Sequence, residues 1–401
     1  MSMPIVCLPP LLKEKIGFFR GFFSKPQFKH FERLVSGFIV SNNKTLQVIN
    51  DSFGDGDQSS FNRFVTTSDF DIGELDSLRL DLVKKEFSLT RKGCLVIDES
   101  LTHKTGRKMD LVGLHRSGVT KKIELGHMLV NSFYVDLAGN EFPVKTSFYV
   151  REGDCEKNGV SFKTKRELAI EQMDFALKNS LPVRLVSVDA GYEGEEFTKE
   201  IKSRGLDFII GVRKSSKFSF ERKQRIDVGT YLESLNEKDF TSAKIDFKEY
   251  FYHIKKVYMR GIGKVKLVIS YPKNEEENIK YYITNLNESE TTIIHLLIKR
   301  WRIECFHRDA KQHLGLEAYQ VRKGRGIQVV VPAILIAYTL VKICAKHLKT
   351  PIRPLKTIGE ICRYLALIAY KGIKWFRNLI KKPLEFIKTL KRLVFTKTAK
   401  V

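Results

Sequence analysis

The sequence predicts an α/β protein in which a mixed β-sheet is flanked by helices, with a helical N-terminal domain and a β-rich insertion. Three observations lead to this prediction. Apolar residues recur at helical spacing up to about residue 88, short β-branched runs follow from residue 89, and alternating apolar residues fill a later stretch. The predicted parts are a helical domain over 1–88, a core over 89–212 plus 287–345, an insertion over 213–286 and a basic helical region over 346–401.

The N-terminal part shows helical patterns over 28–40, 46–53 and 75–87. A Gly-Asp-rich turn over 54–57 separates them. Two interpretations stay open, because the segment carries no recognisable helix-turn-helix pattern. It is either a small DNA-binding domain or a helical cap that packs on the core.

The core begins with a change of period from helix to strand. Three strands, a helix, a strand, a helix and a strand are expected in that order, which is an α/β arrangement. The predicted strands are 94–98, 127–135, 143–150, 183–188 and 207–212, with a hairpin at 136–140 and a helix over 165–179.

The insertion lies in the long interval that follows Asp189. About 115 residues separate Asp189 from Glu304, which is too many for a loop within a compact domain. Alternating runs predict strands over 247–259, 265–271 and 279–284.

The C-terminal part has two distinct segments. The apolar run over 329–341 contains Pro332 and is shorter than the roughly 20 residues that span a bilayer, so we expect a buried core helix rather than a membrane anchor. The last fifty residues are a basic amphipathic pattern, which suits a membrane surface, a partner helix or DNA phosphates. We favour DNA.

No cleavable signal pattern precedes the first helix, so a cytoplasmic protein is expected.

Composition narrows the function classes. The chain has 70 Lys and Arg against 46 Asp and Glu, a formal charge of +24, as in proteins that neutralise nucleic-acid phosphates. Ribosomal, chromatin and membrane-surface proteins are also this basic. Six scattered cysteines, nine histidines without zinc spacing and the absence of a complete Walker A motif argue against a disulfide scaffold, structural zinc and nucleotide hydrolysis.

Two aspartates follow predicted buried strands. Asp98 comes after the apolar run 94–97, and Asp189 comes after 183–188. An acid at the end of such a run is expected at the rim of the sheet, where ligands can reach it. Taken alone, either residue is more commonly a turn residue or a helix cap.

A third acid lies on a predicted helix over 297–315. Arg300, Glu304 and Lys311 are spaced by four and seven residues, so they fall within roughly 40° of one another on the helix surface. Such a stripe is usually a solvated set of ion pairs. Three acids brought together would instead repel one another unless divalent cations lay between them, and Mg²⁺ is the oxygen-seeking candidate.

The local contexts of these acids resemble those of the DDE transposases of bacterial and archaeal insertion sequences, which have a ribonuclease-H-like core. Residues 96–100, Val-Ile-Asp-Glu-Ser, look like the strand of the first acid. Residues 187–192, Ser-Val-Asp-Ala-Gly-Tyr, look like that of the second. The resemblance therefore implies a ribonuclease-H-like mixed sheet.

The third match resembles the signature of the hairpin-forming, cut-and-paste branch. That signature is Tyr, two residues, Arg, three residues, Glu, six residues and Lys. Arg300, Glu304 and Lys311 fit the spacing, whereas Leu297 occupies the tyrosine position. A leucine cannot donate a hydrogen bond to phosphate, so that contact is absent or comes from elsewhere.

The resemblance implies specific roles. The reaction would be two-metal phosphoryl transfer on DNA, with Mg²⁺ as the cofactor and Mn²⁺ as a substitute. The partners would be double-stranded DNA, as terminal inverted repeats and target, and a second copy of the chain on paired ends, in the prokaryotic nucleoid and without a membrane. Aromatic residues of the insertion could stack on a flipped base, and the candidates are Phe251, Tyr252, Tyr258 and Tyr271. The implied catalytic residues and metal ligands are Asp98, Asp189 and Glu304, and the implied DNA contacts are Arg300, Lys311 and His307.

Two other classes remain open. A ribonuclease-H-like nuclease would use the same acids without joining DNA ends. An inactive DNA-binding transposase relic would no longer need the acids, and Leu297 is the residue that favours this possibility.

Overall fold

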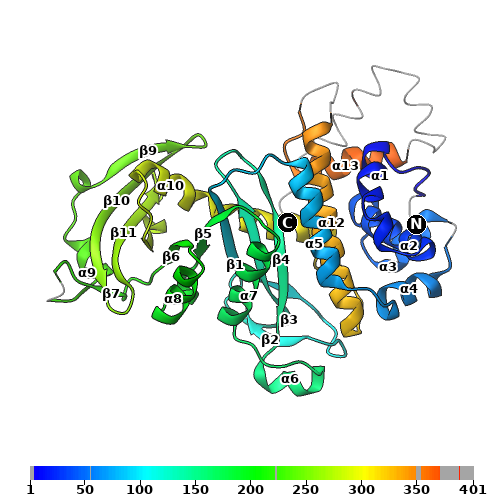
Figure 1. Ribbon diagram of the computed structural model, residues 1–401, viewed down its shortest axis with the longest axis horizontal. Helices are drawn as coiled ribbons and strands as arrows, with labels where there is room; N and C mark the ends of the chain where they lie inside the picture. Colours follow the sequence, from blue (N-terminus) through cyan, green and yellow to red (C-terminus); the bar gives the residue numbers. More distant parts are fainter. Residues whose placement is uncertain (1–3, 55, 222–223, 349–353, 371–387, 389–401) are drawn as a thin grey trace.

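The computed structural model describes residues 4–54, 56–221, 224–348, 354–370 and 388 (Figure 1). Strands occupy one end and the middle of the elongated molecule, and helices occupy the other end. The helices are α1 (Pro10–Gly17), α2 (Lys25–Val40), α3 (Leu46–Phe53), α4 (Gln58–Thr67), α5 (Ile72–Glu86), α6 (Glu152–Asn158), α7 (Lys165–Lys178), α8 (Glu195–Ser203), α9 (Val228–Glu233), α10 (Glu290–Lys299), α11 (Trp301–Leu314), α12 (Gly324–His347) and α13 (Ile358–Ala369). The strands are β1 (Gly93–His103), β2 (Gly113–Arg116), β3 (Ile123–Val135), β4 (Glu141–Tyr149), β5 (Val183–Val188), β6 (Asp207–Gly211), β7 (Lys217–Phe218), β8 (Ile226–Asp227), β9 (Thr241–Ile245), β10 (Lys248–Met259), β11 (Gly263–Pro272) and β12 (Lys280–Thr284).

One mixed sheet organises the molecule. Its ten strands follow the order β2-β3-β1-β5-β6-β12-β11-β10-β9, with β4 also paired to β3. Strand β3 pairs antiparallel with both β1 and β4, whereas β5 pairs parallel with both β1 and β6. This confirms the expected α/β class and its ribonuclease-H-like mixed sheet flanked by helices.

The β-rich insertion extends the core sheet. Strand β12 pairs antiparallel with β6, where Ile283 lies opposite Ile210, and β11, β10 and β9 follow. Without β12, the edge of β6 would leave a row of unpaired backbone groups. The predicted strands of this region are therefore present, but they form one continuous sheet with the core.

Helices cover both faces of the core strands. Helix α7 contacts β3 and β4, while α11 contacts β1 and β3. Because both faces are covered, residues 94–97 of β1 are all fully buried, which explains their continuous apolar run. Strand β1 is longer than predicted and continues to His103, since β3 pairs with it along that whole length.

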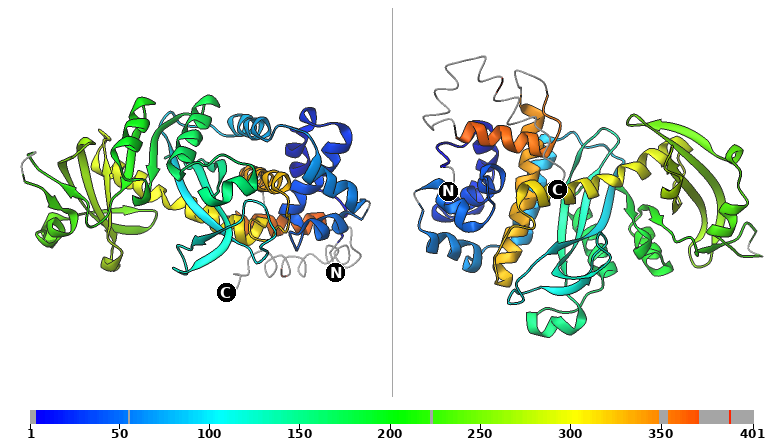
Figure 2. Two further views of the ribbon diagram at one scale, coloured as in Figure 1. Left: turned by 90° about the horizontal axis from the view of Figure 1, so that it is seen from below. Right: turned by 180° about the vertical axis from the view of Figure 1, so that it is seen from behind.

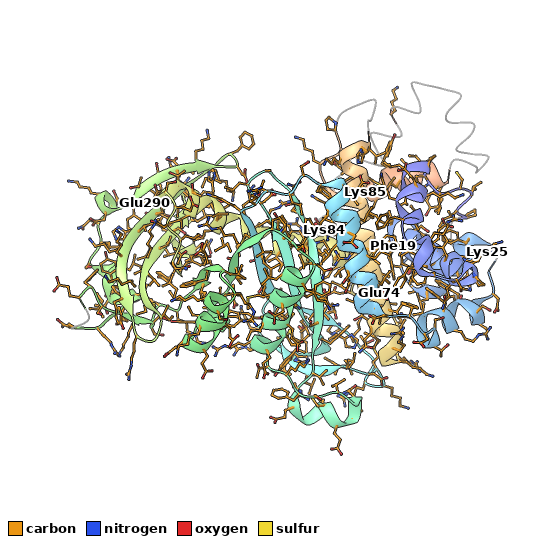
Figure 3. All side chains as sticks on the ribbon, in the orientation of Figure 1. Phe19, Lys25, Glu74, Lys84, Lys85 and Glu290 are labelled. Atoms are coloured by element: carbon orange, nitrogen blue, oxygen red, sulfur yellow. The ribbon has the colours of Figure 1, made fainter. Side chains whose placement is uncertain are left out.

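The N-terminal helices pack around α12. Helices α1, α2, α4 and α5 all contact it. Buried phenylalanines pack among them: Phe19, labelled in Figure 3, lies 5.3 Å from Phe31 between ring centroids, and Phe23 lies 4.6 Å from Phe31. This packing fits a helical cap on the core, while DNA contact by these helices stays a prediction. Helices α1 and α4 were not predicted.

Helix α12 is the predicted buried core helix. By length and composition it could cross a membrane, but most of its apolar stretch is buried inside the protein. Pro332 lies within it. The basic pattern expected over the last residues lies outside the described residues apart from Lys388, whereas α13 belongs to the described part of the C-terminal region.

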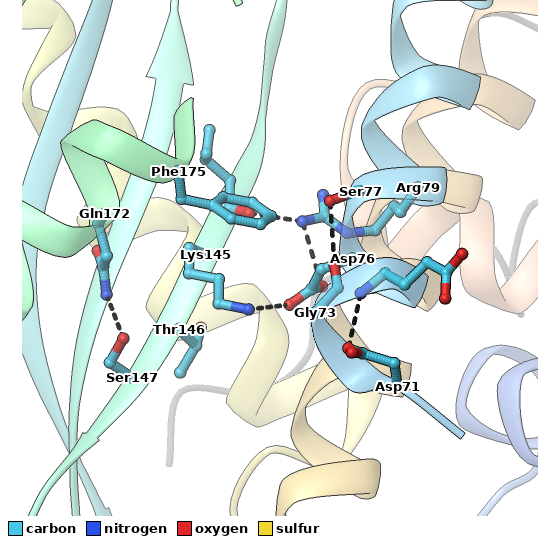
Figure 4. Close-up of polar contacts among 12 residues, drawn as sticks. Asp71, Gly73, Asp76, Ser77, Arg79, Lys145, Thr146, Ser147, Gln172 and Phe175 are labelled. Carbon is cyan, nitrogen blue, oxygen red and sulfur yellow. Dashed lines mark hydrogen bonds and ion pairs between the residues drawn. The ribbon is translucent and has the colours of Figure 1, made fainter. Parts of the chain in front are cut away.

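A buried charge cluster ties the helical region to the sheet (Figure 4). The Arg79 side chain of α5 is fully buried and donates hydrogen bonds of 2.6 Å to the carbonyls of Pro143 and Val144 in β4. Asp76 lies 3.5 Å from Arg79 and 2.8 Å from Lys145. The two cations therefore compensate one buried carboxylate at this junction.

Candidate active site

Asp98 and Asp189 lie side by side at the end of the parallel β1–β5 pair. The last paired residues of these strands are Val96 and Ser187, and each aspartate comes two positions later. Asp189 follows the end of β5 directly, as predicted. The placement of Asp98 at a strand end is corrected, because β1 continues and Asp98 still pairs with Asn131 of β3.

A close backbone approach fixes the position of Asp189. Its carboxylate accepts a hydrogen bond from the Gly191 backbone N–H at 2.9 Å, which starts a short 3₁₀ turn over Ala190–Tyr192. Gly211 of β6 packs against this turn. A Cβ atom at Gly211 would lie 2.8 Å from the Ala190 nitrogen and 3.0 Å from the Asp189 carbonyl carbon. Only a glycine leaves room for Asp189 to lie this close to β6.

Helix α11 brings Glu304 to the same region. Its buried face includes Ile303, Phe306 and Ala310, and the Phe306 ring stacks on Phe133 of β3 at 5.3 Å. Together, α10 and α11 run from the insertion strands to the core (Figure 2). The single helix expected over 297–315 is in fact two helices that meet at Arg300, where the hydrogen bonds Arg300 N–Leu297 O and Ile303 N–Arg300 O span three residues instead of four.

Arg300 is the cation that contacts Glu304 directly. Its guanidinium donates a hydrogen bond of 3.2 Å to Glu304, and it also interacts with the Tyr282 hydroxyl of β12. Only 17% of its side chain is exposed. The β12 strand, held between β6 and β11, thus contributes to the site through Tyr282.

Asp98 feels the charges of the other two carboxylates. Burial raises the pKa of the Asp98 carboxyl to about 7, and Arg300 opposes that rise. The negative charges of Asp189 and Glu304 add to it. Burial also raises the pKa of Glu304. Asp189 and Glu304 therefore lie close enough to Asp98 to disfavour its ionised form.

The donor set fits a hard divalent cation. It consists of carboxylate oxygens, which Mg²⁺ prefers, and burial and mutual repulsion leave these oxygens in need of positive charge. As the side chains lie, the described part of the chain has no group of three His, Cys, Asp or Glu residues drawn together tightly enough to hold one ion. The acids are neighbours without forming a closed metal cage.

A cavity of about 530 Å³ opens beside Glu304. Cationic and aromatic side chains give it a lining suited to phosphates and bases. Trp301 is 57% exposed at its edge. Its lining includes Lys248, Lys280, Tyr282, Leu297, Arg300 and Trp301.

Lys311 and His307 make their hydrogen bonds to groups other than the three acids. The Lys311 ammonium donates a hydrogen bond of 2.7 Å to the Leu101 carbonyl and lies 3.2 Å from Glu317. His307 is buried, with its Nε2 3.1 Å from the Asn131 amide, and burial lowers its pKa to about 3. A DNA contact by His307 stays a prediction, with only a small part of the residue exposed. Lys311 stays a predicted phosphate contact.

Sequence reasoning missed Tyr282 and Lys280. The two residues alternate on β12, so their side chains share one face and line the cavity. Lys280 also interacts electrostatically with Glu304. The predicted strand over 279–284 placed Lys280 and Tyr282 on one face, but only the pairing of β12 with β6 brings Tyr282 close to Asp189. Of the aromatic candidates in the insertion, Tyr271 lines this cavity and stacks on Phe251 at 5.6 Å.

Comparison with known proteins agrees with the resemblance. Residues 164–340 match the transposase DDE domain family, and residues 17–228 match the DDE superfamily endonuclease family. A probable transposase for insertion sequence element IS701 from Microchaete diplosiphon is 25% identical over 261 residues, 64% of this chain. The match takes in 66% of that relative, just under two thirds of its length.

Among solved structures, a piggyBac transposase synaptic complex with hairpin DNA matches at a TM-score of 0.43 and 12% identity, covering 98% of this chain and 83% of that one. The second family model alone extends over more than half of the present chain. The chain belongs to the DDE superfamily of transposases and endonucleases.

Proposed function

We propose that the protein is a DDE transposase that cleaves DNA at the ends of an insertion sequence and joins the freed ends to a target. The observation that carries the proposal is the convergence of Asp98, Asp189 and Glu304 around Arg300, at the end of the parallel strands of a DDE-family chain. The relative named for IS701 supports an insertion-sequence element as the substrate class.

Asp98, Asp189 and Glu304 would hold Mg²⁺, with Mn²⁺ as a substitute. When bound, the metal supplies an activated water and stabilises the leaving 3′ oxygen. Asp98 suits this role because burial and the two neighbouring carboxylates raise its pKa, so an added positive charge would favour its ionised form.

The chain's own residues position the DNA. Cleavage is attack of water on phosphorus with loss of the 3′ oxygen as a hydroxyl, and joining is attack of that hydroxyl on a target phosphorus with loss of another 3′ oxygen. Arg300 would neutralise charge on the phosphate, since its fixed fork of donors matches phosphate oxygens. Lys248 and Lys280 would hold the flanking backbone in the cavity, and Lys311 would contact a phosphate farther along α11.

The wider setting follows from the same proposal. The net charge of +24 suits a protein that holds both terminal inverted repeats and target DNA. We propose a homodimer on paired ends, cut-and-paste transposition, and a location in the prokaryotic cytoplasm at the nucleoid.

A strand-transfer assay tests the proposal. Labelled DNA that carries the element's own ends is incubated with the protein, a target plasmid and Mg²⁺ or Mn²⁺, with a chelator as the control. Metal-dependent 3′-end release followed by joining is expected. Cleavage without joining would indicate a nuclease, and binding without chemistry would indicate a relic, so either result would overturn the proposal.

A further inference from the structure

The cavity beside Glu304 is apolar where Leu297 lines it. Leu297 lies at the end of α10, one turn before Arg300, and is 7% exposed. Its side chain lines the same cavity as Arg300 and Glu304. A leucine provides no donor to a phosphate oxygen, so the helix leaves this part of the cavity without one.

Tyr282 provides a hydroxyl in the same cavity from a different element. It lies on β12, opposite Gly211 of β6 and Val268 of β11, in the interior of the sheet. Hydrogen bonds on both sides make this a rigid position, which suits a residue that must hold a substrate atom in place. Tyr282 and Leu297 thus face one space from a strand and a helix.

The neighbours of the Tyr282 hydroxyl determine whether it can donate a hydrogen bond to a ligand. Arg300 has only donors, so in their interaction the tyrosine oxygen is the acceptor. The hydroxyl proton is then available to a second partner. Glu304 and Asp189 are near enough to interact electrostatically with the hydroxyl, so that partner would lie beside the predicted metal ligands.

We propose that Tyr282 donates a hydrogen bond to a phosphate of the bound DNA end, beside Arg300, and supplies from β12 the donor that Leu297 does not supply from α10. The inference rests on the proposed transposase function. It adds a substrate-contacting residue that lies outside the Arg300 to Lys311 helix segment.

The test compares Tyr282→Phe with Tyr281→Phe. Both changes remove one hydroxyl from β12, but successive side chains of a strand point to opposite faces, and Tyr281 is absent from the cavity lining. The single-turnover rate of end cleavage at saturating DNA should fall roughly 10- to 100-fold for Tyr282→Phe, the effect of losing a hydrogen bond to a charged group, and stay near wild type for Tyr281→Phe.

Rescue separates a phosphate contact from a structural role. Adding Leu297→Tyr to Tyr282→Phe places a hydroxyl in the same cavity from the helix side, so most of the lost rate should return. A Tyr282→Phe rate equal to wild type, an equal loss in Tyr281→Phe, or no recovery in the double variant would overturn the inference.

Two controls distinguish a failure of this inference from a failure of the proposed function. If the wild type cleaves and Glu304→Gln does not, while Tyr282→Phe matches the wild type, only the inference fails. If the wild type does not cleave at all, the proposed function fails. Equilibrium binding of the same end DNA, measured without divalent metal, then tests whether Tyr282 contacts a DNA phosphate. A roughly 2- to 10-fold weaker affinity of Tyr282→Phe, but not of Tyr281→Phe, supports it, and equal affinities overturn it.

Discussion

Arg300 and Glu304 lie one helical turn apart across the junction of α10 and α11, with 3.2 Å between the Arg300 guanidinium and the Glu304 carboxylate. The pair is mostly shielded from water, and Asp98 also interacts with the same guanidinium. Arg300 therefore compensates part of the negative charge of the site before metal or DNA is present. At the junction the backbone hydrogen bonds span three residues instead of four, and this local geometry sets the position of the guanidinium.

Arg300→Lys should lower the cleavage rate by roughly tenfold or more. Lysine keeps the charge, but its single ammonium cannot reproduce the planar fork that contacts Glu304 and Tyr282 together. Single-turnover cleavage of end DNA measures the effect. The matched control is Arg308→Lys on α11, since Arg308 is largely exposed and pairs with its neighbour Asp309. Equal rates for wild type and Arg300→Lys would show that charge alone is needed.

Gly211→Ala should impair cleavage more than it impairs folding. The added Cβ meets the backbone of Asp189 and Ala190, which must shift, and overpacking of this kind costs about 1–3 kcal/mol. We expect a modest fall in the melting temperature together with a large fall in the cleavage rate. Gly118→Ala is the control, because a Cβ there meets no atom within 4 Å. Unchanged cleavage in Gly211→Ala would mean that the exact position of Asp189 matters little.

Arg79→Leu should destabilise the fold by about 3–5 kcal/mol, because it leaves a buried carboxylate short of a partner. Asp76 would keep only Lys145, and the carbonyls of Pro143 and Val144 would lose their donor. Urea denaturation followed by circular dichroism measures the change. Arg63→Leu on the surface of α4 is the control and should stay within about 0.5 kcal/mol. A loss below about 1 kcal/mol for Arg79→Leu would contradict the predicted role of this cluster.

Acidification from about pH 6.5 to pH 4 should destabilise the protein. Burial lowers the pKa of His115, His127 and His313 to about 4 and of His307 to about 3, below the ordinary value of 6.5. The unfolded chain therefore binds more protons in this window, and stability falls as the pH falls. Asp98 acts in the opposite direction, because its raised pKa lets the folded state bind a proton first. The loss of stability from the four histidines is larger than the gain from Asp98.

Thermal unfolding at pH 7.5 and pH 5 measures this pH dependence. The melting temperature should be lower at pH 5. His127→Phe should make the dependence shallower, because it removes one buried titrating ring while keeping an aromatic beside Tyr319, on which His127 stacks at 5.8 Å. A melting temperature that rises on acidification would contradict the burial of neutral histidines.

Local sequence patterns located most of the elements. Helix α3 lies at its predicted bounds, and the strand and turn residues around Gly261 form the β10–β11 hairpin, where Gly261 and Gly263 have positive φ angles of 77° and 99°. Helix α4 was missed because its sequence is largely polar. It begins at Gln58, directly after the expected turn, and Asp57 of that turn caps the backbone N–H groups of Ser59 and Ser60.

The candidate site could be predicted only in part. Asp98, Asp189, Arg300 and Glu304 were identified from sequence and lie together. Tyr282 was not identified, because its place beside Arg300 depends on the pairing of β12 with β6, a long-range register that no local period encodes. The burial of His307 likewise depends on packing of α11 against β3.

The central claim is that Glu304 belongs to a metal-dependent DNA-cleaving centre, and one comparison tests it most directly. Cleavage of labelled element-end DNA in Mg²⁺ is measured for wild type, Glu304→Gln and Glu317→Gln, with end binding and melting temperature measured for each. Glu317, which pairs with Lys311, carries the control substitution. We predict that Glu304→Gln folds and binds ends but does not cleave them, while the control retains cleavage. Cleavage by Glu304→Gln at the wild-type rate would contradict the claim.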